Sequence, residues 1–227
     1  MDSQKHAASP LVVVASEKEG MGLVKRLGLR RDPEIRLPGL CREKNSGLYC
    51  GDKLNLAITG VYEHNMTAAV SLVLHHANRN PLFVLNFGAA GLYAHHHVNA
   101  GLTIGDMVHV QKVCRFDLDD NVHWAPSVDL RCSDACLPKA VCVTGSRYST
   151  ENDRRSPYFP KDGQIEDMEL YGLAVLLQTH KIPLISIKVI ANLVVSDGRQ
   201  QMRNNLSAMI SAAEERIISA IDQEAAV

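Results

Sequence analysis

The sequence predicts a single α/β domain with a mixed, largely parallel, twisted sheet flanked by helices. Short apolar, β-branched runs alternate along the chain with stretches of helical periodicity, and this alternation is typical of parallel strands joined by helices. There is no internal repeat, low-complexity segment or linker, and 227 residues suit one domain. We therefore expect one domain over residues 1–227, with about residues 1–9 as a flexible N-terminal tail.

Composition and charge favour a small ligand. Hydrophobic residues make up 46% and charged residues 22% of the chain, and the formal net charge is −1. This balance gives no electrostatic reason to expect nucleic acid or an anionic membrane as partner. The N-terminus has no apolar core of a signal peptide, and no apolar run approaches the roughly 20 residues that span a bilayer. We expect a cytoplasmic protein.

Neither a metal nor a cofactor is expected. The six cysteines are scattered, and Cys132 and Cys136 have one partial metal spacing without a second pair. In a chain with no export signal, reduced thiols are the simpler interpretation. The run His95–His97 follows a glycine-rich stretch, and we interpret it as part of a solvated loop.

The first third of the chain predicts a strand, a helix and a hairpin. Leu11–Ala15 is apolar and β-branched, which indicates a central strand. Ser16 can cap a helix that continues to Leu27, with acidic residues in its first turn. Leu48–Cys50 and Leu54–Ile58 then predict the two strands of a hairpin.

The next stretch predicts the floor of a binding pocket. A helix over Val61–Asn78 leads to a second buried strand, Leu82–Leu85. Gly88–Gly91 follow as a predicted turn of very small residues, where backbone amides can approach a ligand closely. The alternative is a tight turn whose small residues only allow close packing.

The remaining elements continue the alternation. Phe116–Pro138 is polar and interrupted by prolines, so we expect it to be irregular. Periodicity predicts a helix over Ile165–His180 and a long closing helix whose apolar face runs from Met202 to Ile221. Three further apolar runs predict strands: Asp106–Val110, Ala140–Thr144 and Leu184–Ala191.

Several common catalytic motifs are missing from the sequence. It has no Gly-x-x-x-x-Gly-Lys-Ser/Thr phosphate loop, no Gly-x-Gly-x-x-Gly after the first strand and no Gly-x-Ser-x-Gly elbow. Carboxylates and carboxamides at strand ends or helix starts are compatible with acid–base chemistry on a polyhydroxylated substrate. The residues in such positions are Glu19, Asn86, Asp167, Glu169 and Asn192.

The order of five short motifs resembles the purine nucleoside phosphorylase and nucleosidase superfamily, especially its bacterial nucleosidase branch. They are Ala15-Ser16-Glu17-Lys18-Glu19, Asn86-Phe87-Gly88-Ala89-Ala90-Gly91-Leu92, Gly105-Asp106, Phe159-Pro160 followed by Asp167-Met168-Glu169, and Lys188-Val189-Ile190-Ala191-Asn192. The resemblance covers nearly the whole chain. It implies a nucleoside phosphorylase-like fold with a partly barrel-like sheet, a small-molecule purine nucleoside as ligand, and a homodimer.

The resemblance also implies catalytic roles. Glu19 would be the general base that activates water at the ribose anomeric carbon, and Asn192 would face the purine leaving group. Departure of a purine leaves an oxocarbenium-like sugar, so such a site needs a base for water and a donor for the leaving group.

Binding roles follow from the same resemblance. Glu169 would accept hydrogen bonds from the ribose hydroxyls, Met168 would pack against the sugar, and Tyr148 would stack on the base. Asp167 belongs to the same motif, and Ala89 and Gly91 would form the pocket floor. Ala89 replaces a serine of the family, and Tyr62 stands where Gly-x-Gly is usual.

Two departures distinguish branches of the superfamily. Similar phosphorylases have an arginine at the position of Asn86 and a basic loop after the first strand, because a phosphate dianion needs fixed cations. Their absence favours hydrolysis, although Arg115 or Arg147 could substitute. Asn192 replaces an aspartate of the methylthioadenosine and adenosylhomocysteine nucleosidases, and an amide donor suits a 6-oxopurine.

The leading hypothesis is therefore a nucleosidase for a 5′-modified 6-oxopurine nucleoside such as futalosine, of the menaquinone pathway. One alternative is a 5′-methylthioadenosine/S-adenosylhomocysteine nucleosidase, and another is an inactive nucleoside-binding protein. The group on the ribose 5′ carbon stays open, because variable segments near Phe116–Trp124 would build that part of the pocket.

Overall fold

The computed structural model describes residues 9–35, 37, 44–76, 81–94, 101–117, 126–132, 136–195 and 197–225. Several predictions fall outside these residues. They concern most of the N-terminal tail, the end of the helix predicted to reach Asn78, the run His95–His97, and the parts of the predicted irregular segment that span 118–125 and 133–135.

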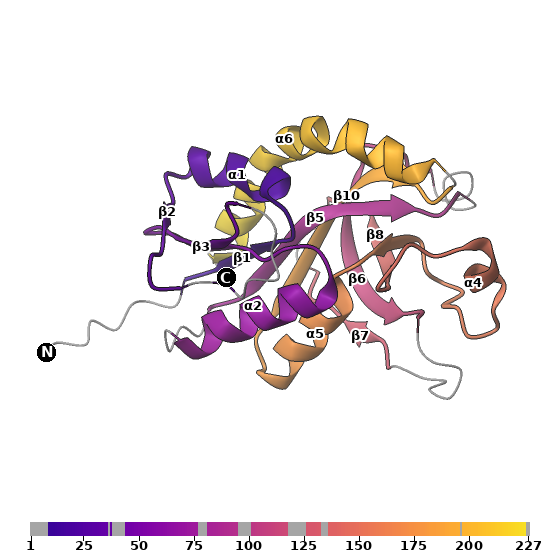
Figure 1. Ribbon diagram of the computed structural model, residues 1–227, viewed down its shortest axis with the longest axis horizontal. Helices are drawn as coiled ribbons and strands as arrows, with labels where there is room; N and C mark the ends of the chain where they lie inside the picture. The colour runs from indigo at the N-terminus through magenta and orange to yellow at the C-terminus, as the bar shows by residue number, and fades with distance from the viewer. Residues whose placement is uncertain are drawn as a thin grey trace, which may run out of the picture.

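A ten-stranded mixed sheet organises the molecule (Figure 1). Its strands are β1 (Leu11–Val14), β2 (Arg30–Arg31), β3 (Gly47–Cys50), β4 (Asn55–Ile58), β5 (Val84–Leu92), β6 (Met107–Arg115), β7 (Val128–Asp129), β8 (Lys139–Thr144), β9 (Ile165–Asp167) and β10 (Leu184–Leu193). The helices are α1 (Glu17–Arg26), α2 (Glu63–His76), α4 (Glu151–Arg155), α5 (Leu170–Thr179) and α6 (Gly198–Ala225).

The sheet is partly closed into a barrel, as expected. β10 pairs with β5 in parallel and with β6 antiparallel, and β6 continues through β8 and β9 back to β5. This ring brings the ends of β5, β9 and β10 together. The central strands β4, β1, β5 and β10 are parallel, whereas β6, β7, β9 and the edge strands also form antiparallel pairs.

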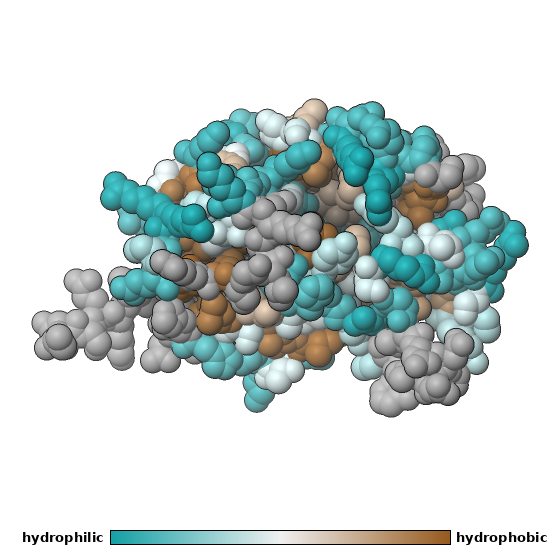
Figure 2. Space-filling view, in the orientation of Figure 1, coloured by the Kyte–Doolittle hydropathy of each residue, from teal (hydrophilic) through white to brown (hydrophobic). Residues whose placement is uncertain are grey.

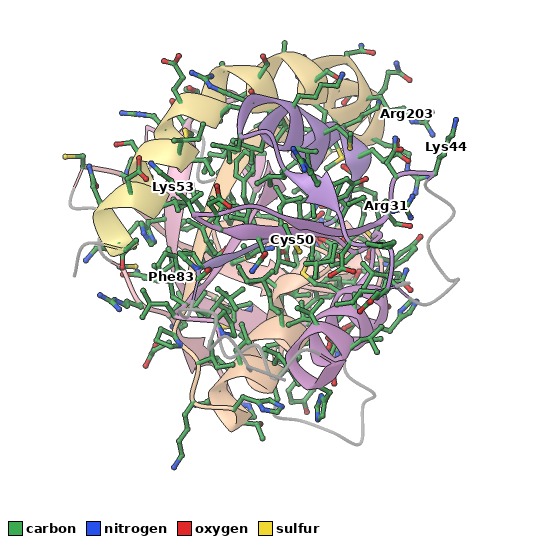
Figure 3. All side chains as sticks on the ribbon, turned by 90° about the vertical axis from the view of Figure 1, so that its left-hand side faces the viewer. Arg31, Lys44, Cys50, Lys53, Phe83 and Arg203 are labelled. Carbon is green, nitrogen blue, oxygen red and sulfur yellow. The ribbon has the colours of Figure 1, made fainter. Side chains whose placement is uncertain are left out.

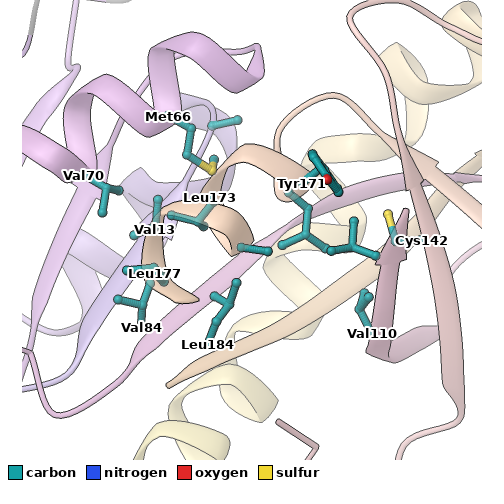
Figure 4. Packing of buried hydrophobic residues seen from close by; sticks show 14 of the residues in the cluster. Val13, Met66, Val70, Val84, Val110, Cys142, Tyr171, Leu173, Leu177 and Leu184 are labelled. Carbon is teal, nitrogen blue, oxygen red and sulfur yellow. The ribbon is translucent and has the colours of Figure 1, made fainter. Parts of the chain in front are cut away.

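Helices cover both faces of the sheet and bury two apolar clusters. On one face, Met66 and Val70 of α2 and Leu173 and Leu177 of α5 pack against strand residues such as Val84 (Figure 4). On the other face, α1 and α6 lie together over the sheet (Figure 1). Because each cluster is almost fully buried, it holds the strand ends of the barrel in fixed relative positions.

Strands β3 and β2 are the last two strands at one end of the sheet. Arg31 on β2 and Cys50 on β3 lie at the strand edge that faces the viewer in Figure 3. The outer surface over α6 is largely hydrophilic (Figure 2), in keeping with an amphipathic closing helix. In the described part of the chain, no helix has the length and apolar character needed to cross a membrane.

Three boundary predictions were wrong. The stretch Gly88–Gly91 is not a turn, because β5 runs without interruption to Leu92 and all nine of its residues are buried. Ile165–His180 is not one helix: Ile165–Asp167 forms β9, and α5 begins only at Leu170. The strand predicted to end at Val110 continues to Arg115. In each case pairing with neighbouring strands outweighs local pattern.

Candidate functional site

A cavity of about 180 Å³ lies where α1, β5, β9 and the first turns of α6 meet. Its walls combine small, apolar and acidic residues. The described lining residues are Ala15, Ser16, Glu19, Val61, Ala89, Gly91, Arg147, Tyr148, Glu166, Asp167, Met168, Glu169, Met202 and Leu206. All the predicted catalytic and binding residues are among them except Asn192, and so are all the polar candidates at strand ends or helix starts except Asn86 and Asn192.

Glu19 is held in one orientation by donors directly after β1 and by one donor within β5. Its Oε2 accepts hydrogen bonds from the backbone nitrogens of Ala15 and Ser16, at 3.1 and 2.8 Å, and from the Ser16 hydroxyl at 3.0 Å. Its Oε1 accepts a hydrogen bond from Ala89 N at 3.0 Å. Since a carboxylate oxygen has two lone pairs, Oε1 keeps one acceptor position for a water molecule or a ligand.

Glu169 also lines the cavity and contacts a residue with an unusual backbone conformation. Its Oε1 accepts a hydrogen bond from the Tyr62 backbone nitrogen at 3.0 Å. Tyr62 has φ 86°, a left-handed conformation that non-glycine residues seldom adopt. Burial, and then the nearby Asp167 carboxylate, raise the pKa of Glu169 to about 7. The side chain can therefore change charge near neutral pH.

Asp167 is tied into the protein interior. Its Oδ2 lies 2.7 Å from the Lys188 ammonium, and its Oδ1 accepts a hydrogen bond from the Thr144 hydroxyl at 2.6 Å. Although burial opposes the charge of Lys188, the Asp167 carboxylate raises the pKa of this ammonium. Asp167 also accepts from Leu170 N, the first residue of α5. Its side chain thus positions α5 and its neighbour Glu169.

Tyr148 and Met168 form an apolar wall. The Tyr148 hydroxyl lies 3.3 Å from the sulfur of Met202, and the Arg199 guanidinium lies 5.5 Å from the Tyr148 ring centroid. These contacts attach the start of α6 to the cavity. The tyrosine is half-buried, so one part of its ring area is available to a planar ligand.

Glycines on β5 allow acidic side chains to approach the strand. A Cβ on Gly88 would lie 2.9 Å from Glu19 Oε1. A Cβ on Gly91 would lie 3.2 Å from Asn192 Nδ2 and 3.5 Å from Glu166 Cγ. The small residues predicted to form the cavity floor therefore do lie there, in a strand.

Asn192 lies behind this floor and does not line the cavity. It is buried near the end of β10, and its Nδ2 donates to the carbonyl of Leu193 at 2.8 Å. Its Oδ1 has no hydrogen-bond partner among the described residues. The amide nitrogen carries two N–H groups, so one remains after the bond to Leu193.

Sequence reasoning missed Glu166, the residue before the predicted motif. The helix predicted over Ile165–His180 gave Glu166 no role, whereas in the structure Glu166 and Asp167 belong to β9, and both line the cavity together with Glu169. Also missed were Ser16, Val61, Met202 and Leu206, whereas Arg147 was considered only as a substitute for the arginine of similar phosphorylases. The stretch Ile165–Glu169 does not alternate between apolar and acidic residues, so its local pattern held no signal for a strand.

Two arginines near the cavity, Arg115 and Arg147, are already paired with carboxylates. Arg115 contacts Glu63 and Asp117, each at 2.9 Å. Arg147 binds both carboxylate oxygens of Asp153, at 2.6 and 2.8 Å. Among the described residues, no three His, Cys, Asp or Glu side chains are grouped so that they could hold a metal ion.

Asn86 does not reach the cavity either. It is buried in β5, where its Nδ2 donates to Val13 O at 3.3 Å and its Oδ1 accepts from the Ser186 hydroxyl at 3.0 Å. The position that carries an arginine in similar phosphorylases is thus part of the sheet interior here.

Comparison with solved structures identifies the fold. The chain matches the 5′-methylthioadenosine nucleosidase of Arabidopsis thaliana with a TM-score of 0.80 and 19% identity, over 96% of each chain. It matches the Helicobacter pylori 5′-methylthioadenosine/S-adenosylhomocysteine nucleosidase bound to butyl-thio-DADMe-Immucillin-A with a TM-score of 0.78 and 15% identity, over 95% of this chain and 98% of that one.

A third similar structure is the futalosine hydrolase of Helicobacter pylori, with a TM-score of 0.78 and 15% identity over 95% of this chain and 98% of that one. No family model and no curated protein matches the sequence. The chain therefore has the same fold as these nucleosidases and this hydrolase.

Proposed function

We propose that the protein hydrolyses the N-glycosidic bond of a purine nucleoside. The observation that carries this proposal is the Glu19 carboxylate, which four donors hold at the cavity while Oε1 keeps a free lone pair. A fixed carboxylate beside a sugar-sized cavity is the arrangement that a general base for water requires. The solved structures with this fold include nucleosidases.

The other cavity residues match the remaining needs of the reaction. As the purine departs, the sugar develops oxocarbenium character and the base gains electron density. Glu169 would accept hydrogen bonds from ribose hydroxyls, Met168 would pack on the sugar, and Tyr148 would stack on the base. The carboxylates of Glu19 and Glu169 also favour developing positive charge on the sugar.

Hydrolysis is favoured over phosphorolysis by the electrostatics of the site. Among the described lining residues Arg147 alone is cationic, and Asp153 pairs with both ends of its guanidinium. Two buried carboxylates, Glu19 and Glu169, would oppose a phosphate dianion close to the sugar. A neutral water molecule meets no such barrier.

For the base, we propose a 6-oxopurine, as in futalosine. The second N–H of Asn192 can be donated through the gap at Gly91 toward N7 or the 6-oxo group of such a base. The alternative substrates are 5′-methylthioadenosine and S-adenosylhomocysteine, the compounds named for two of the similar structures. An inactive nucleoside-binding protein is the other alternative, since Ala89 and Asn192 replace two polar residues of the family.

One experiment separates these possibilities. The protein is incubated with inosine, futalosine and methylthioadenosine, with and without phosphate, and the released base and sugar are identified by chromatography. We expect hypoxanthine and free sugar at a rate that phosphate does not change. Ribose 1-phosphate as product would exclude hydrolysis, and binding without turnover of any nucleoside would support the inactive alternative.

A further inference from the structure

A buried carboxylate in the cavity wall has one oxygen without a partner. Glu166 is 4% exposed and lines the cavity. Its Oε2 accepts hydrogen bonds from the Tyr93 hydroxyl at 3.0 Å, from Ser149 N at 3.3 Å and from the Ser149 hydroxyl at 2.5 Å. Its Oε1 is buried and has no hydrogen-bond partner among the described residues.

A buried oxygen without a hydrogen bond destabilises the folded protein unless a bound molecule supplies the donor. A buried acceptor that lacks a hydrogen bond loses the solvation it had in water. Because Oε2 already accepts three hydrogen bonds, the carboxyl group is held in one orientation. In this orientation Oε1 has no donor among the described residues. A ligand in the adjacent cavity is the natural source of the missing donor.

Glu19 and Glu166 reach β5 at different points along this strand. Glu19 meets β5 at Gly88 and Ala89, whereas Glu166 pairs with Gly91 across β9 and β5. Three residues of extended strand separate the two points by roughly 10 Å. If water attacks the sugar beside Glu19, the outer edge of the base extends toward Glu166.

We propose that Glu166 is a specificity-determining residue, whose Oε1 accepts a hydrogen bond from a ring N–H of a 6-oxopurine. This inference rests on the proposed function for the orientation of the nucleoside. A 6-oxopurine carries a hydrogen on N1, whereas N1 of an adenine is an acceptor. A carboxylate acceptor therefore discriminates between the two bases at this position.

Glu166→Gln provides a sharp test because the geometry dictates how the amide must lie. The backbone N–H of Ser149 can only donate, so it requires an acceptor at the position of Oε2, whereas the hydroxyls of Tyr93 and Ser149 can also accept. The glutamine oxygen must take that position, which leaves its NH₂ group at the position of Oε1. The substitution thus exchanges an acceptor for a donor with almost no change in shape.

Binding of the free bases measures this exchange without relying on turnover. Isothermal titration calorimetry is performed with hypoxanthine and adenine on the wild type, on Glu166→Gln and on Glu151→Gln, an exposed control on α4. In Glu166→Gln we expect the affinity for hypoxanthine relative to adenine to fall by about tenfold to a hundredfold. The control should keep the wild-type ratio, and circular dichroism melting should show that Glu166→Gln is folded.

Two results would overturn the inference. An unchanged ratio would mean that Oε1 carries a proton or faces no base, and failure of the wild type to bind either base would remove the base site. If the wild type hydrolyses no nucleoside but Glu166→Gln still lowers the affinity for hypoxanthine relative to adenine, the role of Glu166 is supported and the proposed function is refuted. If the wild type hydrolyses a nucleoside but Glu166→Gln keeps the wild-type affinity ratio, the proposed function is supported and the role of Glu166 is refuted.

Discussion

At the scale of single residues, the proposed chemistry depends on Glu19. Glu19→Gln keeps a side chain of the same shape but removes the basic oxygen, so we expect turnover to fall by about two to four orders of magnitude. Substrate binding should be largely retained. Steady-state kinetics on a nucleoside that the wild type hydrolyses provide the measurement. Turnover at the wild-type rate would show that Glu19 only caps the turn before α1.

The second prediction at this scale concerns the charge of Glu169. Burial raises its pKa to about 7 in the folded protein, so the fold binds this proton more tightly than the unfolded chain does. The resulting stabilisation is complete below the ordinary pKa of a glutamate and is lost as pH rises through about 7. Glu169→Gln stays neutral throughout. We therefore expect the free energy of unfolding of Glu169→Gln, relative to that of the wild type, to increase by a few kcal/mol as the pH rises from 4 to 8.

Urea unfolding at several pH values measures this difference. Glu151→Gln, on the exposed surface of α4, is the matched control and should follow the wild type. A Glu169→Gln protein whose relative stability does not depend on pH would refute the assignment of a raised pKa to this carboxyl.

At the scale of elements, the start of α5 determines where Glu169 lies. The Thr144 hydroxyl donates to Asp167 and accepts from Tyr171 N at 3.1 Å, so it satisfies a backbone donor in the first turn of α5. Thr144→Val preserves the shape but leaves that buried N–H unpaired. We expect a loss of about 1–3 kcal/mol in the free energy of unfolding.

The other end of the same helix offers a control. Thr179 is exposed and donates only to Val175 O within α5, so Thr179→Val should change stability by less than about 0.5 kcal/mol. Denaturant midpoints of the two variants are compared directly. Equal midpoints would mean that Thr144 contributes nothing to the start of α5.

At the scale of the whole molecule, the state of assembly stays a prediction. Val61 and Tyr62 are 37% and 42% exposed although both are apolar or aromatic, and they precede α2 at the side of the cavity. Exposed apolar side chains beside a site are typical of a protein interface. We expect a homodimer by light scattering at micromolar concentration, and a monomer would show that the cavity is built from one chain.

Local pattern in the sequence was sufficient for the general architecture. The apolar runs at Leu11–Ala15 and Leu184–Ala191 form central strands, and the apolar face from Met202 to Ile221 belongs to α6. These elements are long or strongly patterned, and each buries its apolar side against the same sheet. The α/β class and the barrel-like sheet implied by the resemblance are thus confirmed.

What only the tertiary structure decided is the geometry around β5. Local sequence cannot reveal that Gly88–Gly91 continue a strand, because their extended conformation depends on hydrogen bonds to β10 and β9. The same pairing makes Ile165–Asp167 a strand, and this brings Glu166 into the cavity wall beside Glu169. Sequence alone also could not show that Asn192 lies behind Gly91, with one N–H of its amide bonded to the Leu193 carbonyl. Contacts between segments far apart in the chain set these side-chain positions, and local periodicity carries no information about such contacts.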